Sequence, residues 1–159
     1  MSNRIIGASV MEQELYDHVT SHADSERETL QAYEQLASTT KSAAFAYLAR
    51  LILADEHRHH QMLGDLATTI RTDSELSDNP GPIPRLDLRK DRQAILAATE
   101  RLLAIEQQDN KELKALAKEM NDLKDTTAWA LIIEIMQADN AKHLRILKFI
   151  KSHTRHPAY

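Results

Sequence analysis

The sequence predicts an all-α protein: a single domain, residues 1–159, built as a bundle of four helices with one long connection between the second and the third. The composition favours helix over sheet, because only three glycines and four prolines stand among many Ala, Leu, Glu, Gln and Lys residues. Apolar residues also recur at alternating steps of three and four, which is the period of an amphipathic helix. The segment 74–88 differs, because it contains a proline-rich run that a helix cannot accommodate.

We expect helices at about residues 9–37, 43–72, 90–120 and 125–152. Ser9 and Glu12 have the spacing of a capping box, which places the start of the first helix. Short polar breaks separate the first helix from the second and the third helix from the fourth. The chain should therefore form one helical hairpin, a long connection and a second helical hairpin.

The segment 74–88 is long enough to return the chain along the whole bundle. The second helix should measure roughly 45 Å, and a fully extended segment of this length spans up to roughly 50 Å. The third helix would then run parallel to the second, so that the segment is a crossover connection. The alternative is an up-and-down bundle in which the segment is a loose loop.

The composition excludes several kinds of site and partner. The chain has no cysteine, which excludes disulfides, thiolate zinc sites, iron–sulfur clusters and cysteine nucleophiles. Any metal must therefore be held by oxygen and imidazole. The net charge of −4, without a basic stripe, argues against nucleic acid as a partner. No stretch is apolar enough to span a membrane and no signal peptide is recognisable, so we expect a cytoplasmic location.

Acid, amide and histidine residues interrupt the apolar stripe near the middle of each expected helix. The interruptions are Glu26, Glu56 with His59, Glu106 with Asp109, and Asn140 with His143. A carboxylate that is buried alone costs several kcal/mol or takes up a proton. Interruptions at a similar depth in all four helices need a shared explanation, and a bound pair of cations supplies one.

The spacing of these residues supports a metal site. Glu56 and His59 stand on one helix face, so the carboxylate can bridge two ions while the imidazole binds one of them. The second half of the chain echoes the first, because Ala-Asp-Glu-His-Arg-His at 54–59 parallels Ala-Asp-Asn-Ala-Lys-His at 138–143. One helix before each motif stands a lone acid, Glu26 or Glu106.

These residues resemble the ferritin-like, specifically the rubrerythrin-like, family over most of the chain, from about Leu15 to Ile150. Glu26 to Tyr33, followed by Glu56-x-x-His59, resembles the first hairpin of that family, and residues 104–118 resemble the start of the second. The resemblance implies a ferritin-like bundle with a non-haem dimetal site, holding two iron ions or, as the alternative, manganese. It also implies chemistry with oxygen or peroxide, or the oxidation and handling of iron.

The sequence departs from the family pattern in two ways. The acid expected before His143 is Asn140, a neutral and poorer ligand that cannot bridge two ions. Asp109 compensates if it is counted, because it restores four carboxylates beside two histidines, and Asp139 is a second candidate. The rubredoxin-type iron centre is missing because there is no cysteine, so redox turnover would need an external electron donor.

Three functions remain open on sequence grounds. They are a redox-active dimetal protein, a metal-binding or iron-handling module without turnover, and a metal-free bundle that acts as a structural or interaction module. Several site residues also have a plainer interpretation: Glu56 and His59 as an ion pair, His143 as a core histidine, and Asn140 as a polar residue that fixes helix register. Association into a homo-oligomer is left open.

Three further histidines are not expected to bind metal. His57 and His60 lie off the apolar stripe, so we expect both in solvent. His22 lies one turn before Glu26, and we expect it to pack against its neighbours rather than act as an additional ligand.

Overall fold

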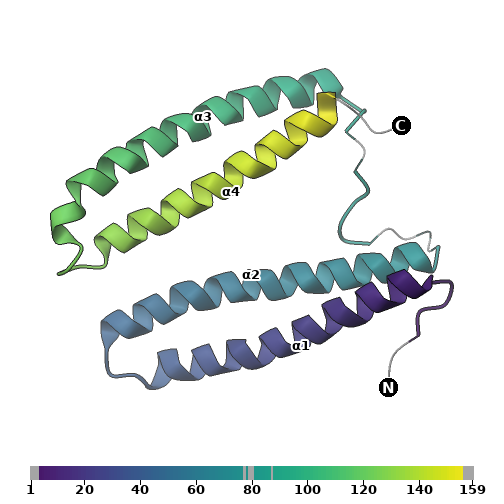
Figure 1. The fold of residues 1–159 in the computed structure, drawn as a ribbon, viewed down its shortest axis with the longest axis horizontal. Helices are drawn as coiled ribbons and strands as arrows, with labels where there is room; N and C mark the ends of the chain where they lie inside the picture. The colour runs from purple at the N-terminus through teal and green to yellow at the C-terminus, as the bar shows by residue number, and fades with distance from the viewer. Residues whose placement is uncertain (1–3, 77, 79–80, 87, 156–159) are drawn as a thin grey trace. The chain divides into compact units, whose positions relative to one another are not determined.

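Helices are the regular secondary structure in the part of the chain that the structure describes. The computed structural model describes residues 4–155 apart from 77, 79, 80 and 87. It contains α1 (Val10–Thr39), α2 (Ala43–Ser74), α3 (Arg92–Glu119) and α4 (Trp129–Arg155), with a short 3-10 helix, η1 (Asn121–Leu123), before α4 (Figure 1). No strand occurs among these residues, so the prediction of an all-α protein with four long helices is confirmed. None of the described helices has the length and apolar character needed to cross a membrane.

The chain divides into two compact units, Met1–Arg85 and Leu86–Tyr159. In the first unit α1 packs along α2, and in the second α3 packs along α4 (Figure 1). The two expected hairpins are therefore present, and residues 75–91 form the long connection between their helices. The crossover itself and the parallel course of α2 and α3 remain predictions. Part of the proline-rich run, Asn79 and Pro80, lies outside the described residues.

The start of α1 confirms the capping box. The Ser9 hydroxyl accepts a hydrogen bond from the Glu12 backbone N–H at 3.3 Å, and the Glu12 carboxylate accepts one from the Ser9 backbone N–H at 2.7 Å. These two bonds satisfy donors that a helix start leaves without partners, and they lower the pKa of Glu12. At the start of α2, Ser42 plays the same part by accepting from the Phe45 N–H at 3.2 Å.

Within each hairpin, the residues that face the partner helix follow steps of three and four. We call these residues the seam. In α2 the seam runs from Ala46 and Ala49 through Glu56 and His60 to Ser74, and every member is buried or half-buried. Ala46 and Ala49, both buried, lie near the α1–α2 turn. The seam residues are, in α1, Val19, Glu26, Leu30 and Ala37; in α3, Thr99, Leu103, Glu106 and Leu113; and in α4, Ile133, Asn140 and Thr154.

A second row of residues lies beside the seam on each helix and recurs at steps of seven or fourteen residues. We call it the flank row. Its members are Leu15, His22 and Leu36 of α1; Ile52, His59 and Leu66 of α2; Leu102, Asp109 and Leu116 of α3; and Trp129, Met136 and His143 of α4. Its apolar members remain between 36% and 58% exposed. The stripes expected from the sequence therefore combined two rows, of which only the seam is covered inside the hairpin.

The first hairpin is closed at the end where α1 begins and α2 finishes. Gly7 has a φ of +88°, and a side chain there would meet the carbonyl oxygen of Ser74 at 2.8 Å. The beginning of the long connection lies against the same end of α2. Gly81 sits so close to Thr69 that a Cβ atom would come within 2.6 Å of its Cα, and the Ile83 N–H donates to the Thr69 hydroxyl at 3.1 Å.

The second hairpin is closed where α3 begins and α4 finishes. The Arg92 guanidinium donates to the Arg155 carbonyl at 3.0 Å, which places the two ends together in an antiparallel pair. Glu100 accepts from Lys151 and Arg155, each at 3.1 Å. The hydrogen bond and charge of Lys151, followed by the charge of Arg155, lower the pKa of Glu100. Ion pairs and a hydrogen bond therefore join α3 to α4 at this end of the hairpin, where few large apolar side chains are buried.

Candidate metal centre

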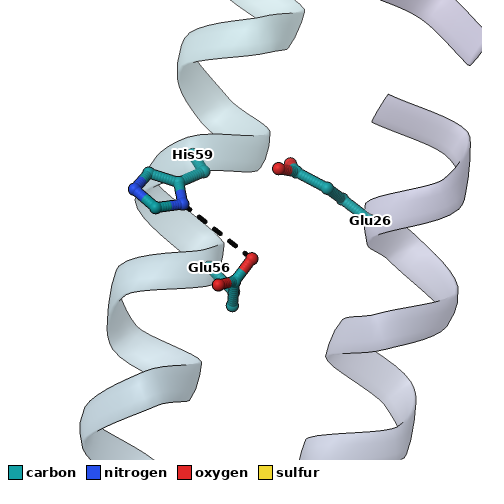
Figure 2. A group of neighbouring side chains, drawn as sticks. All are labelled: Glu26, Glu56 and His59. Atoms are coloured by element: carbon teal, nitrogen blue, oxygen red, sulfur yellow. Dashed lines mark ion pairs between the residues drawn. The ribbon is translucent and has the colours of Figure 1, made fainter. Parts of the chain in front are cut away.

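Three predicted ligands come together in the first hairpin. Glu26 projects from α1, while Glu56 and His59 project from α2, and Figure 2 shows the Glu26 carboxylate directed toward the other two side chains. Each residue offers one ligand atom, and these atoms all lie within 4.8 Å of one another. Among the described residues, this is the only group of three or more histidine, aspartate or glutamate side chains that meets this distance.

The seam explains why these side chains converge. Glu26 and Glu56 are both seam residues, so the antiparallel pairing of α1 with α2 turns them toward each other. His59 belongs to the flank row one turn beyond Glu56, on the side of the hairpin that also carries His22. The side chain of Glu26 is 13% exposed and that of Glu56 is 25% exposed, whereas that of His59 is 50% exposed. The group is thus sheltered at its acids and open at its histidine.

The Glu26 carboxylate has an oxygen that the rest of the described structure does not satisfy. Its Oε2 is buried and has no hydrogen-bond partner among the described residues. Its Oε1 lies 3.6 Å from His22 Nε2, beyond normal hydrogen-bond length. His59 Nδ1 is 3.8 Å from Glu56 Oε2, so this imidazole is not held by a hydrogen bond to its neighbour either. Two acids with little internal compensation favour a cation between them.

The donor set fits a hard divalent cation. Carboxylate oxygen and imidazole nitrogen suit iron(II), manganese(II) and zinc(II), and no softer sulfur donor competes in a chain without cysteine. The buried oxygen of Glu26 agrees with a bound cation, because a cation would give that atom the partner it lacks among the described residues. Three protein ligands leave room on the metal for water or another small ligand.

The other four predicted residues line one groove on the second hairpin. Glu106 and Asp109 come from α3, and Asn140 and His143 come from α4. The groove has a volume of about 310 Å³. Its remaining lining residues are Leu113, Met136 and Asp139, and the sequence had already indicated Asp139 as a second candidate ligand.

Asn140 is tied directly to Glu106. Its side-chain nitrogen donates to the Glu106 backbone carbonyl at 3.0 Å and to Glu106 Oε2 at 2.7 Å. Only the amide nitrogen can donate to a carbonyl, so the orientation of the Asn140 amide is fixed. Its Oδ1 is buried without a partner among the described residues, and the whole residue is only 4% exposed. Glu106 Oε2 also lies 3.3 Å from His143 Nδ1.

The echo between the two halves extends to the structure of the hairpins. Glu26 and Glu106 occupy corresponding seam positions, Glu56 corresponds to Asn140, and His59 corresponds to His143 in the flank row. The outward acids correspond as well, because Asp55 pairs with Arg58 and Asp139 pairs with Lys142 three residues later. Asp139 therefore has a cation as partner on the surface, which weakens its case as a substitute ligand.

Of His22, His57 and His60, which were not expected to bind metal, two differ from expectation. His57 is exposed as expected, and it lies 3.5 Å from Glu34 of α1. His60 is not in solvent: it is a seam residue, and its Nδ1 is buried with no partner among the described residues. His22 does not pack, since its side chain is 60% exposed beside Glu26. The spacing of α2 could have identified His60 as a seam residue. Ala46, Ala49 and Glu56 already follow helical spacing, and His60 continues it four residues after Glu56.

No protein family, characterised protein or solved structure was found to match this chain. The structure supports a protein of four helices with one carboxylate–histidine group that could hold a metal ion. The rubrerythrin-like assignment and the dimetal site remain predictions.

Proposed function

We propose that the protein binds divalent metal ions through Glu26, Glu56 and His59, and that this group is one half of a dimetal centre. Glu106, Asp109, Asn140 and His143 would form the other half. The observation that supports the proposal most directly is the buried, unpartnered oxygen of Glu26 within 4.8 Å of two further ligand atoms. A purely structural hairpin gains nothing from burying such an oxygen.

The flank row supports a ferritin-like bundle as the setting of this centre. In an antiparallel pair, rows with the same offset from the seam lie on the same side of the hairpin. Each hairpin therefore has one half-exposed apolar side, with histidine or aspartate in its middle. We propose that these two sides pack against each other in the folded protein, as the crossover predicts. Packing would bury leucines above and below the acids and keep bulk water from them.

Iron(II) is the metal we expect, with manganese(II) as the alternative, because both accept carboxylate and imidazole ligands. When bound, iron would supply redox chemistry with oxygen or peroxide, and electrons would come from an external donor. The side chains of the protein would hold the ions, neutralise their charge and shape the cavity.

A metal-free structural role is the second candidate, and one observation favours it. The hydrogen bonds from Asn140 give Glu106 a partner without any cation. If the first cluster behaved in the same way, the acids would serve only to fix the pairing of the helices.

Metal binding can be tested by exchanging a single oxygen for nitrogen in the carboxylate of Glu26. We expect purified protein that has not met chelators to contain bound metal by elemental analysis, and Glu26→Gln to lose most of it. In the unmutated protein, metal at about 100 times its dissociation constant should raise the melting temperature by about 5–10 °C. Metal-free Glu26→Gln should unfold at a higher temperature than the metal-free parent, because the buried charge is gone.

Glu28→Gln is the matched control, since Glu28 is an exposed acid on the same helix. It should leave both metal content and the metal-dependent shift unchanged. Protein that takes up no metal after anaerobic loading with iron(II) would disprove the proposal, as would equal metal loss in both variants.

A further inference from the structure

The two clusters correspond residue for residue, yet they differ at one seam position. Each has a lone glutamate on its first helix, a seam residue facing it and a histidine in the flank row. The facing residue is Glu56 in the first hairpin and Asn140 in the second. At this position the first hairpin has a charged carboxylate, which only accepts hydrogen bonds. The second hairpin has a neutral amide, which can also donate them.

The exchange changes how each lone glutamate is satisfied. In the first hairpin a carboxylate faces Glu26, and Glu26 Oε2 stays buried without a partner among the described residues. In the second hairpin the Asn140 amide donates to both the backbone and the carboxylate of Glu106, with the carboxylate bond at 2.7 Å. A metal ion would fill an unmet need in the first cluster, but in the second it would compete with a charge-assisted hydrogen bond.

The oxygen of Asn140 keeps the second cluster from being closed to metal altogether. Oδ1 is buried, has no partner in the described part of the chain, and belongs to a residue that lines the groove with Asp109 and His143. An amide oxygen is a ligand that hard cations accept, although it brings no charge. The second cluster can thus offer ligands, but with weaker attraction than the first.

We propose that the two clusters take up metal unequally, and that Asn140 is the residue that sets the difference. This inference rests on the proposed metal-binding function. The Glu26–Glu56–His59 cluster binds the first ion tightly. The second cluster binds about 10- to 100-fold more weakly, the ratio that corresponds to one hydrogen bond with a charged group. A chain at moderate metal concentration therefore holds one ion, and the second site fills only when metal is abundant.

The test is equilibrium dialysis of the full-length protein against manganese(II) alone, with metal per chain measured by elemental analysis. We expect one tight and one weak ion for the unmutated chain. Asn140→Asp, which keeps the shape of the side chain but removes the donor, should tighten the second ion about 10- to 100-fold. Metal-free Asn140→Asp should melt at a lower temperature than the parent, and manganese(II) should reverse that loss.

The reverse substitution is made in the first hairpin. Glu56→Asn gives that cluster the chemistry of the second, so the tight ion should be lost while the metal-free protein becomes more stable. This variant tests the inference even if Asn140→Asp fails to fold. Two ions of equal affinity in the unmutated chain, or an unchanged second affinity in Asn140→Asp, would overturn the inequality and leave metal binding intact. No binding in any of these proteins would overturn both.

Discussion

The Glu26 carboxylate and the Asn140 amide show how single atoms distinguish two otherwise equivalent hairpins. Both residues occupy the seam at mid-helix, where packing against the partner helix excludes water from them. Glu26 retains a buried oxygen without a partner in the described structure, whereas Asn140 uses its nitrogen to satisfy Glu106. Burial of polar atoms is costly wherever a partner is missing. At this scale, the first hairpin leaves a carboxylate oxygen without a partner, whereas the second leaves only a neutral amide oxygen, Asn140 Oδ1, in that state.

A second residue-scale prediction concerns Glu100 and its pH dependence. Its pKa is lowered in the folded protein by the hydrogen bond and charge of Lys151. A lowered folded pKa stabilises the protein at pH values above the ordinary pKa of 4.5, and that stabilisation is lost as the pH falls through the folded pKa. Glu100→Gln should therefore lower the melting temperature at pH 7 by a small amount, and the difference should vanish in strong acid.

Thermal unfolding between pH 2 and pH 8 is the measurement. Glu134→Gln is the control, because Glu134 is an exposed acid of α4. A difference between Glu100→Gln and the parent that persists unchanged in acid would show that the effect does not come from the ionised carboxylate.

At the scale of helices, local chemistry fixes where α1 and α2 begin, and the seam identifies the side that each helix buries. Capping hydrogen bonds at Ser9 and Ser42 begin α1 and α2. In proteins most helical stability comes from packing of an amphipathic face rather than from intrinsic propensity, and here that packing runs along the seam. The seam of the first hairpin is rich in alanine and contains several polar residues. A two-helix hairpin with such a thin core needs additional cover.

Replacing two glycines of the first hairpin by alanine should change the stability of the protein in opposite directions. Gly64 lies inside α2 with nothing within 4 Å of a Cβ atom built there, so Gly64→Ala should stabilise the protein by about 0.5–1 kcal/mol through helix propensity. Gly7 has positive φ and lies against the Ser74 carbonyl. Gly7→Ala should therefore destabilise the protein by at least about 1 kcal/mol.

Chemical denaturation of both variants measures these changes directly. A stabilising effect of Gly7→Ala would mean that the turn before α1 does not rest on the end of α2. The Gly64→Ala variant serves as its matched control, since it makes the same substitution in the same hairpin.

At the scale of the whole molecule, the flank row is the feature that most needs an explanation. It places half-exposed leucine, isoleucine, methionine and tryptophan on one side of each hairpin. Exposed apolar residues that recur at heptad spacing indicate a surface that becomes covered, and scattered ones do not. Closure of the proposed bundle would cover both sides at once and would surround the ligands with apolar residues.

Trp129 reports on this closure, because it is the one tryptophan of the chain and belongs to the flank row. It is 58% exposed on its own hairpin. If the bundle closes as proposed, acrylamide should quench Trp129 fluorescence much less in the native protein than in the unfolded chain. Leu102→Asp, which places a charge in the same row of α3, should increase the quenching of Trp129.

The control for Leu102→Asp is Arg101→Asp, a substitution at an exposed position one residue away on α3. It should leave the quenching unchanged. Native quenching as strong as that of the unfolded chain would contradict closure over this row.

The sequence by itself determined the helices, the hairpins and the residues of both clusters. Each rests on local chemistry: glycine and proline content, the Ser9–Glu12 capping box, and the spacing of Glu56 from His59. Only the tertiary structure separated seam from flank row, and so showed that His60 is half-buried while His22 is exposed. Rows three and four residues apart lie within one broad arc of a helix, so periodicity alone cannot tell which row the neighbouring helix covers. The same holds for Asn140, because an amide becomes a ligand or a donor only when its partner across the hairpin is in place.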